Sequence, residues 1–217
     1  MQNYVIIPAH DEEKSIKGTI TKAKRHSFNI VVVDDGSKDR TAEICTHEKV
    51  TLLHHKVNLG KGAALKTGCD YALTQGAKNI VVIDADGQHD PNLIPFFFKE
   101  LENAEIVFSH RERSKNMPLV LKLGNIFINK FLTLLYGVKI NDSQCGYRAF
   151  TADAYHKVRW NANDYFMETE MIINAGKAKL KYTQIPIETV YNDKFKGTTV
   201  KDGVLIIMKM ISSRLFK

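Results

Sequence analysis

Carboxylate side chains crowd the end of one predicted strand, in the stretch VVIDADGQHD at residues 81–90. Asp84, Asp86 and Asp90 repel one another unless a positive group lies among them. Hard divalent cations such as Mg²⁺ prefer oxygen ligands and usually keep waters and substrate phosphates around them. Because the small residues between the acids let the chain turn, we predict that Asp84, Asp86 and Gln88 bind one such ion. The alternative is a strand-end turn with solvated acids.

A second pair of acids ends another predicted strand, in VVVDDGSKDRT at residues 31–41. Carboxylates accept hydrogen bonds from the N–H groups of a nucleobase or from ribose hydroxyls, and we predict this role for Asp34 and Asp35. The alternative is that each is a turn residue. Asp39, with Thr41, is typical of a helix N-cap and is predicted to be structural.

The glycine-rich stretch NLGKGAALKTG, at residues 58–68, has the composition of a phosphate-binding loop. A P-loop requires Ser or Thr after Gly-Lys, and Gly62 stands there instead. The dinucleotide fingerprint requires a third glycine where this chain has Leu65. A nicotinamide-dependent dehydrogenase is therefore a remote alternative. Its fingerprint belongs after the first strand, and it predicts no cluster of acids of the kind that binds metal.

Alternating strands and helices must position these groups. Short β-branched runs between helices are typical of a parallel sheet that is covered on both faces, and ligands bind such sheets at the carboxyl ends of the strands. The acids of both stretches are therefore predicted to converge on one crevice. Strands are predicted at residues 3–8, 29–35, 50–55, 79–86, 105–110 and 182–191, helices at 12–26, 39–48, 61–76, 91–103, 118–137, 165–178 and 198–216, and a loop that enters a short strand at 142–150.

Basic residues are in excess and unevenly distributed. The chain of 217 residues carries a formal net charge of +7, and the segments 110–130 and 194–217 each hold a local excess of Lys and Arg. Such an excess favours an anionic partner: nucleic acid, a phospholipid surface or a phosphorylated substrate. The alternative is a solvated basic face. No known nucleic-acid-binding motif accompanies these segments, so nucleic acid is not predicted as a partner.

The composition is that of a soluble globular protein, with 44% hydrophobic and 25% charged residues. No run of about 18 uncharged apolar residues predicts a membrane span, and the N-terminus lacks the features of a secretory signal. Three widely separated cysteines form no zinc-binding or CxxC pattern. Together these features predict a cytoplasmic protein with free thiols.

Seven motifs, in the same order along nearly the whole chain, resemble glycosyltransferase family 2, inverting enzymes with the GT-A fold. They are IIPAHDEEKSI, VVVDDGSKDRT, NLGKGAALKTG, VVIDADGQHDP, DSQCGYRAF, METEMI and IPIETVY. The chain looks most similar to the branch of dolichyl-phosphate mannose and glucose synthases. The resemblance implies an α/β fold, a Rossmann-like, doubly wound and mostly parallel sheet with helices on both faces. It also implies a single domain, with a nucleotide-sugar-binding half at 1–110, an acceptor half at 111–197 and a basic amphipathic C-terminal helix at 198–217.

The resemblance implies roles for individual residues. Asp84, Asp86 and Gln88 match ligands of Mg²⁺ or Mn²⁺, and Asp142 matches an acid that is often proposed as the catalytic base. Arg111 matches an Arg near the diphosphate or the acceptor phosphate, and Arg148 follows Asp142 in the same acceptor-side loop; both are predicted to be catalytic. The remaining matches are Pro8, Ala9, Glu12, Asp34, Asp35, Lys61, Asp84, Ala85 and Asp86 for the nucleotide sugar, and Lys122, Glu168 and Glu170 on the acceptor side. The chain departs from the family pattern at Asp11, where Asn is more usual, and ahead of Arg111, where Ser-His stands.

The resemblance and the basic segments together predict an inverting, metal-dependent glycosyltransferase. Its donor is predicted to be a UDP- or GDP-sugar, and its acceptor a polyprenyl or dolichyl phosphate. A phosphate acceptor is already ionised and needs cations, which Arg111, Lys122 and Arg148 offer. The alternative acceptor is a hydroxyl group of a glycan or protein. That acceptor needs a general base, for which Asp142 is the candidate.

The last predicted helix is amphipathic and basic. Val200, Val204, Met208, Ile211 and Leu215 follow helical spacing, while basic residues lie away from the centre of that face. This pattern predicts an interfacial helix that contacts anionic lipid, which would make the protein peripheral on the inner face of the cytoplasmic membrane. The alternative is an ordinary terminal helix that packs on the rest of the domain.

Overall fold

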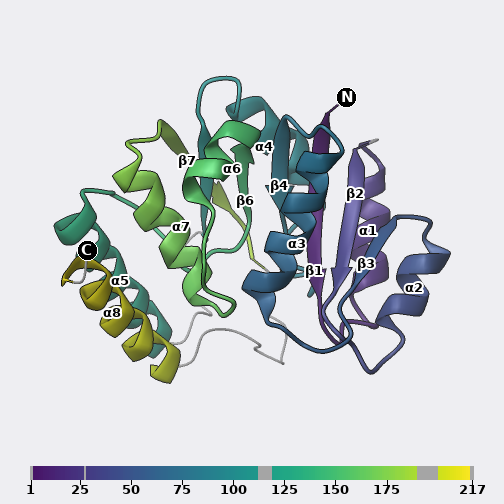
Figure 1. Ribbon diagram of the computed structural model, residues 1–217, viewed down its shortest axis with the longest axis horizontal. Coiled ribbons are helices and arrows are strands. Elements are labelled where there is room, and N and C mark those ends of the chain that lie inside the picture. Colours follow the sequence, from purple (N-terminus) through teal and green to yellow (C-terminus); the bar gives the residue numbers. More distant parts are fainter. Residues whose placement is uncertain (1, 27, 112–118, 190–199, 216–217) are drawn as a thin grey trace.

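One mixed sheet forms the centre of the protein (Figure 1). The computed structural model describes residues 2–26, 28–111, 119–189 and 200–215. Within them, the strands are β1 (Asn3–Ala9), β2 (Asn29–Asp34), β3 (Thr51–His54), β4 (Asn79–Val82), β5 (Ile106–Arg111), β6 (Arg148–Thr151) and β7 (Tyr182–Ile187). Their order across the sheet is β3-β2-β1-β4-β6-β5-β7. Only β6 is antiparallel to its neighbours, β4 and β5, so the sheet is mostly parallel, as predicted.

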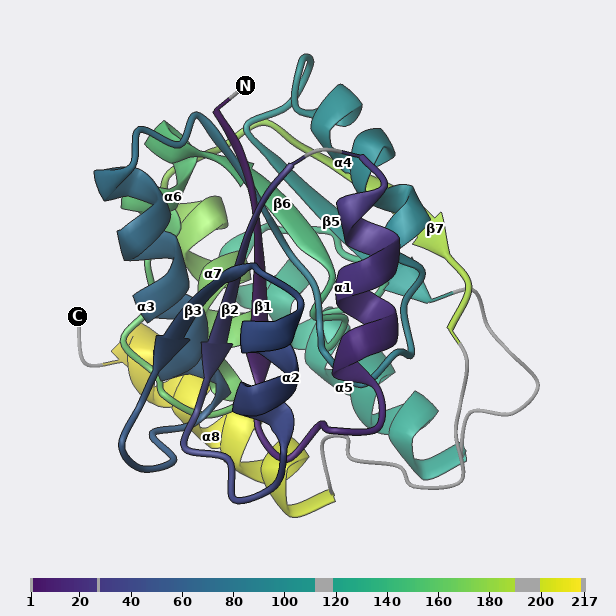
Figure 2. The ribbon, with the colours of Figure 1, turned by 90° about the vertical axis from the view of Figure 1, so that its right-hand side faces the viewer.

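Helices cover both faces of the sheet (Figures 1 and 2). They are α1 (Ile16–Lys24), α2 (Thr41–His47), α3 (Lys61–Thr74), α4 (Ile94–Glu100), α5 (Leu119–Tyr136), α6 (Ala152–Val158), α7 (Phe166–Lys177) and α8 (Val200–Leu215). Successive side chains of a strand point to opposite faces, so Ile6 of β1 joins one buried cluster, while Val5 and Ile7 join the other. The first cluster holds residues of α3, α5, α6, α7 and α8, and the second holds residues of α1, α2 and α4. The doubly wound α/β fold is confirmed.

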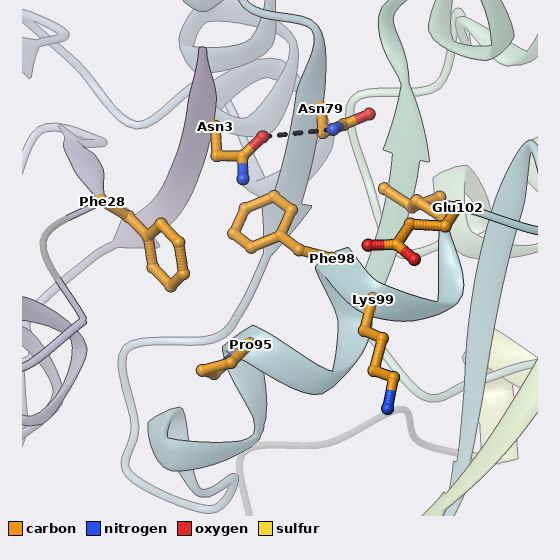
Figure 3. Close-up of a pocket in the computed structure, with 8 residues that line it drawn as sticks. Asn3, Phe28, Asn79, Pro95, Phe98, Lys99 and Glu102 are labelled. Atoms are coloured by element: carbon orange, nitrogen blue, oxygen red, sulfur yellow. Dashed lines mark hydrogen bonds between the residues drawn. The ribbon is translucent and has the colours of Figure 1, made fainter. Parts of the chain in front are cut away.

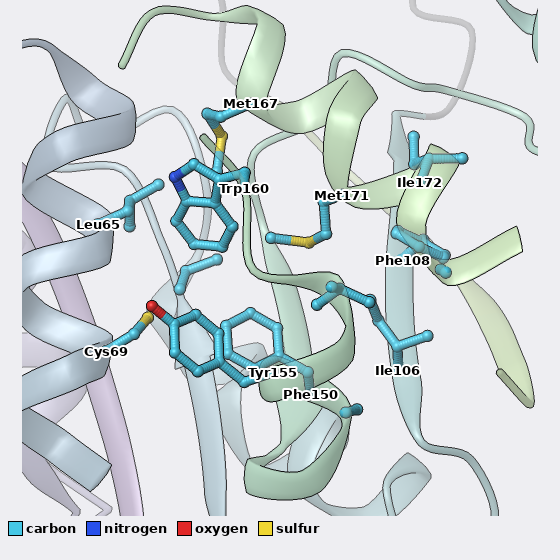
Figure 4. Close-up of a cluster of buried hydrophobic side chains, with 14 of the residues drawn as sticks. Leu65, Cys69, Ile106, Phe108, Phe150, Tyr155, Trp160, Met167, Met171 and Ile172 are labelled. Atoms are coloured by element: carbon cyan, nitrogen blue, oxygen red, sulfur yellow. The ribbon is translucent and has the colours of Figure 1, made fainter. Parts of the chain in front are cut away.

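The larger cluster connects the two halves of the chain (Figure 4). Trp160 and Tyr155 are fully buried there against Leu65 of α3 and Met167 of α7. The indole Nε1 of Trp160 donates a hydrogen bond to the backbone oxygen of Gly62, 2.8 Å away. The segment that follows Trp160 is thereby held against the first turn of α3.

Two elements, β4 and α6, differ from the prediction. The strand expected at 79–86 ends at Val82, so Asp84 and Asp86 lie in the turn that follows. Helix α6 was not predicted, although Thr151 caps it by accepting a hydrogen bond from the Ala154 N–H, 3.1 Å away. Its short length and mixed polarity give a weak helical period.

Helix α8 packs on the domain through a face that the sequence did not identify. Ile206 and Met210 are buried in the larger cluster, and the Tyr136 hydroxyl of α5 donates to the Met210 backbone oxygen at 2.8 Å. Met208 and Ile211, predicted to belong to the centre of the apolar face, are 61% and 40% exposed. The side chains of Val200, Val204 and Leu215 lie outside the described part of the protein. No helix in the described ranges is long and apolar enough to cross a membrane.

Candidate active site

A cavity of about 510 Å³ lies at the carboxyl ends of β1, β2 and β4. Parallel pairing aligns these ends, with Ala9 opposite Asp34 and the Asp35 N–H donating to the Ala9 backbone oxygen at 2.8 Å. The cavity is lined by Pro8, Ala9, His10, Asp11, Glu12, Asp35, Asn58, Gly60, Lys61, Ala64, Asp84, Ala85, Asp86, Asp164 and Tyr165. Of the residues predicted for the nucleotide sugar, all except Asp34 line it.

A second hollow of about 310 Å³ lies at the other end of the strands (Figure 3). Asn3 and Asn79, the first residues of β1 and β4, form part of its wall, together with Phe28 and Phe98. Its lining residues include one carboxylate, that of Glu102, and one amine, that of Lys99 (Figure 3). The acid-rich cavity at the carboxyl ends is therefore the candidate active site.

The paired acids after β2 hold the adjoining loops. Asp34 is fully buried and accepts hydrogen bonds from His54 Nδ1 at 2.7 Å and from the Ser37 N–H at 3.2 Å. Asp35 accepts from the Leu59 and Gly60 N–H groups, at 2.9 and 2.8 Å, and from His55 Nδ1 at 2.7 Å. Asp35 lines the cavity and Asp34 lies beneath it, so the predicted ligand contact is geometrically open to Asp35 only.

The glycine-rich loop packs against protein backbone. Gly60 has φ +96°, and a Cβ atom there would lie 2.4 Å from the Asn163 backbone oxygen. A Cβ at Gly62 would lie 2.3 Å from the Ala162 backbone oxygen, and the Gly62 N–H donates to Asn163 O at 2.8 Å. These glycines therefore allow the close approach of the 160–165 segment, and the loop follows β3 rather than β1, unlike a dinucleotide fingerprint.

Lys61 lies between two carboxylates of different parts of the chain. Its Nζ is 2.7 Å from Asp84 Oδ1 and 3.0 Å from Glu168 Oε1. Burial alone would lower the pKa of Lys61, but the charges of Asp84 and Glu168 raise it above its ordinary value. The same ammonium keeps the pKa of Asp84 low in spite of burial. Gly146 packs closely against this ion pair: a Cβ on it would lie 2.7 Å from Lys61 Nζ and 2.9 Å from Asp84 Oδ2.

The charge of Asp86 is poorly compensated by its surroundings. Burial and the nearby charge of Asp84 raise the pKa of Asp86 above its ordinary value. Its Oδ1 accepts from the backbone N–H of Gln88 at 3.0 Å. The predicted set of Asp84, Asp86 and Gln88 is not preassembled, since Asp84 pairs with Lys61 and no group of three His, Cys, Asp or Glu side chains among the described residues surrounds a metal position. The hard, crowded oxygens nevertheless fit a divalent cation.

His89 is a buried site residue that sequence reasoning did not identify. Its side chain lies beside Tyr147, with ring centroids 5.6 Å apart, and its Nδ1 has no hydrogen-bond partner among the described residues. Burial lowers its pKa, while the charges of Asp84 and Asp86 act in the opposite direction and those of Lys61 and Arg111 add to the lowering. His89 therefore lies within electrostatic reach of both the Asp84–Asp86 turn and Arg111. Its place directly after Gln88 was the available signal.

Arg111 and Asp142 form a buried, two-point ion pair. Arg111 Nε is 2.6 Å from Asp142 Oδ2, and Nη2 is 3.0 Å from Oδ1. Asp142 is 4% exposed, and burial would raise its pKa, but the hydrogen bonds and charge of Arg111, with a hydrogen bond from Asn125, lower it. Asp142 is thus an ionised partner of Arg111.

Three predicted acceptor-side residues have other surroundings than expected. Arg148 is 1% exposed and donates to the backbone oxygens of Cys145, Ser143 and Glu168, so its assignment to an acceptor phosphate is corrected to a structural one. Glu170 accepts from the backbone N–H groups of residues 161 and 162, and holds the segment beside α3. Glu168 faces Lys61, and its Oε2 is buried with no hydrogen-bond partner among the described residues. The side chain of Lys122 lies outside the described part.

Comparison with known proteins gives this site a context. The model of the family named Glycosyl transferase family 2 matches residues 4–159. A UDP-N-acetylglucosamine–dolichyl-phosphate N-acetylglucosaminyltransferase of Methanococcus voltae is 35% identical over 99% of this chain and 96% of its own. A dolichyl-phosphate β-glucosyltransferase of Trichomonas vaginalis is 30% identical over 94% of this chain and 69% of its own.

Solved structures support the fold. Glucosyl-3-phosphoglycerate synthase of Mycobacterium tuberculosis, crystallised with Mn²⁺, UDP and glucosyl-3-phosphoglycerate, superposes with a TM-score of 0.73. The match covers 98% of this chain and 79% of that one, at 19% sequence identity. The same arrangement of strands and helices is thus found in a protein that holds a nucleoside diphosphate and a divalent metal.

Proposed function

Because the chain belongs to glycosyltransferase family 2, and to its branch of polyprenyl-phosphate sugar synthases, we propose that it moves a sugar from a nucleotide sugar to a polyprenyl phosphate, with inversion and with Mg²⁺ or Mn²⁺. The dehydrogenase alternative is set aside by this membership. Two relatives are named for transfer to dolichyl phosphate, one of them from a UDP-sugar. We therefore take UDP as the first nucleotide to test.

The observation that carries the donor side is the charge of the cavity wall. Six carboxylates line it, against Lys61 as the one Lys or Arg among its described lining residues. A nucleoside diphosphate is itself anionic, so it would be repelled from this wall unless a cation entered with it. The carboxylates are those of Asp11, Glu12, Asp35, Asp84, Asp86 and Asp164.

Asp86, with Asp84 beside it, would hold the divalent cation. The bound ion supplies Lewis-acid stabilisation of the charge that develops on the leaving diphosphate. Asp86 suits this role because its charge is poorly compensated without a cation. Lys61 adds a second positive charge at the same end of the cavity, held in place by Asp84 and Glu168.

The acceptor side is supported by the Arg111–Asp142 pair. A phosphate oxygen is already ionised at neutral pH and requires positive charge for binding, which the guanidinium of Arg111 offers. Attack on the anomeric carbon from the side opposite to the diphosphate inverts that carbon. A hydroxyl acceptor would instead need a base that can take a proton, and Arg111 holds the pKa of Asp142 low.

We propose that a lipid acceptor contacts α5 and α8, which lie side by side (Figure 1). Large apolar side chains are 40–79% exposed on these two helices: Phe127 and Leu134 on α5, and Leu205, Met208 and Ile211 on α8. Apolar side chains on neighbouring helices with basic residues around them are typical of contact with a membrane interface. We include peripheral contact with anionic membrane in the proposal.

Thermal unfolding with UDP, GDP and NAD, each with and without Mn²⁺, tests the donor assignment. A ligand that binds only the folded state raises Tm. We expect stabilisation by a nucleoside diphosphate that depends on Mn²⁺. Stabilisation by NAD without metal, with none by UDP or GDP, would contradict the proposal.

A further inference from the structure

Asp142 lies in a polar seam between the end of β5, helix α5 and the 141–144 loop. It accepts two hydrogen bonds from the Arg111 side chain, at 2.6 and 3.0 Å, and one from the Arg111 backbone N–H at 3.3 Å. Asn125 Nδ2 donates to it at 2.7 Å, and the Gln144 N–H at 3.1 Å. Both carboxylate oxygens are therefore occupied by donors.

Helix α5 supplies the wall of this seam through two asparagines. Asn125 contacts Asp142 directly and also accepts from the Ser143 hydroxyl at 3.1 Å. Asn129, about one turn further on, contacts only the loop backbone: it donates to Asn141 O at 2.8 Å and accepts from the Ser143 N–H at 3.1 Å. Asn125 thus contacts the Asp142 carboxylate and the Ser143 hydroxyl, whereas the side chain of Asn129 contacts the loop backbone and not Asp142.

We propose that Asp142, aided by Asn125, is a positioning residue that fixes the guanidinium of Arg111 for the acceptor phosphate, and that it does not act as the base. This inference rests on the proposed function, since it assigns Arg111 to a phosphate. A guanidinium carries five N–H donors in one plane, so a carboxylate that accepts hydrogen bonds from two of its nitrogens fixes the orientation of that plane.

The same geometry argues against proton transfer by Asp142. A general base needs an oxygen that can reach the acceptor and take its proton. Protonation of Asp142 would remove the carboxylate charge that faces the Arg111 guanidinium and would weaken the two charge-assisted hydrogen bonds between them. The Gln144 N–H and the Asn125 side chain also donate to Oδ1 of Asp142, so this oxygen is already occupied by hydrogen-bond donors.

A double-mutant cycle tests this inference. Asp142→Asn is made in the wild-type protein and in an Arg111→Gln background, and transfer from a UDP-sugar to a short polyprenyl phosphate is measured. In the wild-type background we expect a loss of about 10- to 100-fold in kcat/KM for the acceptor, with the KM for the donor unchanged and the pH profile unchanged in shape. In the Arg111→Gln background the same substitution should cost less than about threefold, because residues that act as one unit are not additive.

The base assignment makes the opposite predictions. A full loss of kcat on Asp142→Asn in both backgrounds, or disappearance of the acid limb of the pH profile, would overturn the inference. Asn125→Ala should raise the acceptor KM more than the matched Asn129→Ala does, and equal effects would show that only the loop matters. Thermal unfolding of every variant monitors folding. Wild-type protein that transfers to no polyprenyl phosphate would refute the proposed function itself, whereas additive losses in an active enzyme would refute only the inference.

Discussion

Lys61→Met isolates the electrostatics of the candidate site. The substitution keeps the length of the side chain and removes the ammonium that lies 2.7 Å from Asp84 Oδ1 and 3.0 Å from Glu168 Oε1. Removing one partner of a buried ion pair destabilises by about 3–5 kcal/mol. Because the Lys61 and Asp84 side chains are 19% and 23% exposed, we expect the lower value, about 3 kcal/mol at pH 8. For a chain of this size that is a decrease of about 6–12 °C in Tm.

The dependence of this loss on pH follows from the sign of the shifts. In the wild-type protein Lys61 holds the pKa of Asp84 below its ordinary value, which contributes stability above the unfolded-state pKa of about 4. Without Lys61, burial acts to raise the folded-state pKa of Asp84, so its ionised form is less favourable in the folded protein above that pH. The decrease in Tm caused by Lys61→Met should therefore be larger at pH 8 than at pH 5, where the carboxyl groups protonate more readily.

The assay is thermal unfolding of Lys61→Met and wild type at both pH values, with and without Mn²⁺. The matched control is Lys66→Met on the same helix, which should change Tm less, since the charge of Lys66 acts on Asp70 and is not among the causes of the pKa shifts of Asp84 and Asp86. A divalent cation can replace the missing positive charge, so Mn²⁺ should raise the Tm of Lys61→Met more than that of wild type. A decrease in Tm that is equal at both pH values and unaffected by Mn²⁺ would refute this electrostatic reasoning.

Three further substitutions test other parts of the account. Gly146→Ala should weaken Mn²⁺–UDP binding at least tenfold, measured by calorimetry, because its Cβ would displace Lys61 and Asp84, whereas Gly18→Ala, whose Cβ meets no atom within 4 Å, should not. Asp86→Asn should abolish transfer yet leave Tm at pH 8 equal to that of wild type or higher. Burial and Asp84 raise the pKa of Asp86, so its ionised form is unfavourable in the folded protein above about pH 4. A large decrease in Tm would contradict this. Leu205→Ser with Met208→Ser should reduce co-sedimentation with anionic vesicles without unfolding the protein, since both side chains are more than half exposed; unchanged binding would exclude α8 as the contact surface.

Strand ends and their acids were predictable because parallel pairing places them at one edge of the sheet. The β-branched runs before Asp34 and Asp84 identified β2 and β4, and the convergence of their carboxyl ends follows from the fold. What each acid touches was not predictable, because its partners come from distant segments. Asp34 is held by His54, and Lys61 is shared by Asp84 and Glu168.

The surroundings of the two arginines and the packing face of the last helix were not predictable from the sequence either. Arg111 and Arg148 are equally basic in the printed chain, yet only the packing reveals that Arg148 is surrounded by backbone oxygens. The sequence did not show which side of α8 packs on the core, because apolar residues occur on more than one side of the helix. Ile206 and Met210 are buried in the core, and Ile207 packs against it. A hydrophobic period identifies a helix but not which of two apolar sides faces the protein.

Transfer of radiolabelled sugar to a polyprenyl phosphate, compared with the matching polyprenol, tests the central claim most directly. We expect a lipid-linked product from the phosphate only. It should be lost in EDTA, restored by Mn²⁺ and opposite in anomeric configuration to the donor. Transfer to the polyprenol, or product formation that is unaffected by EDTA, would contradict it.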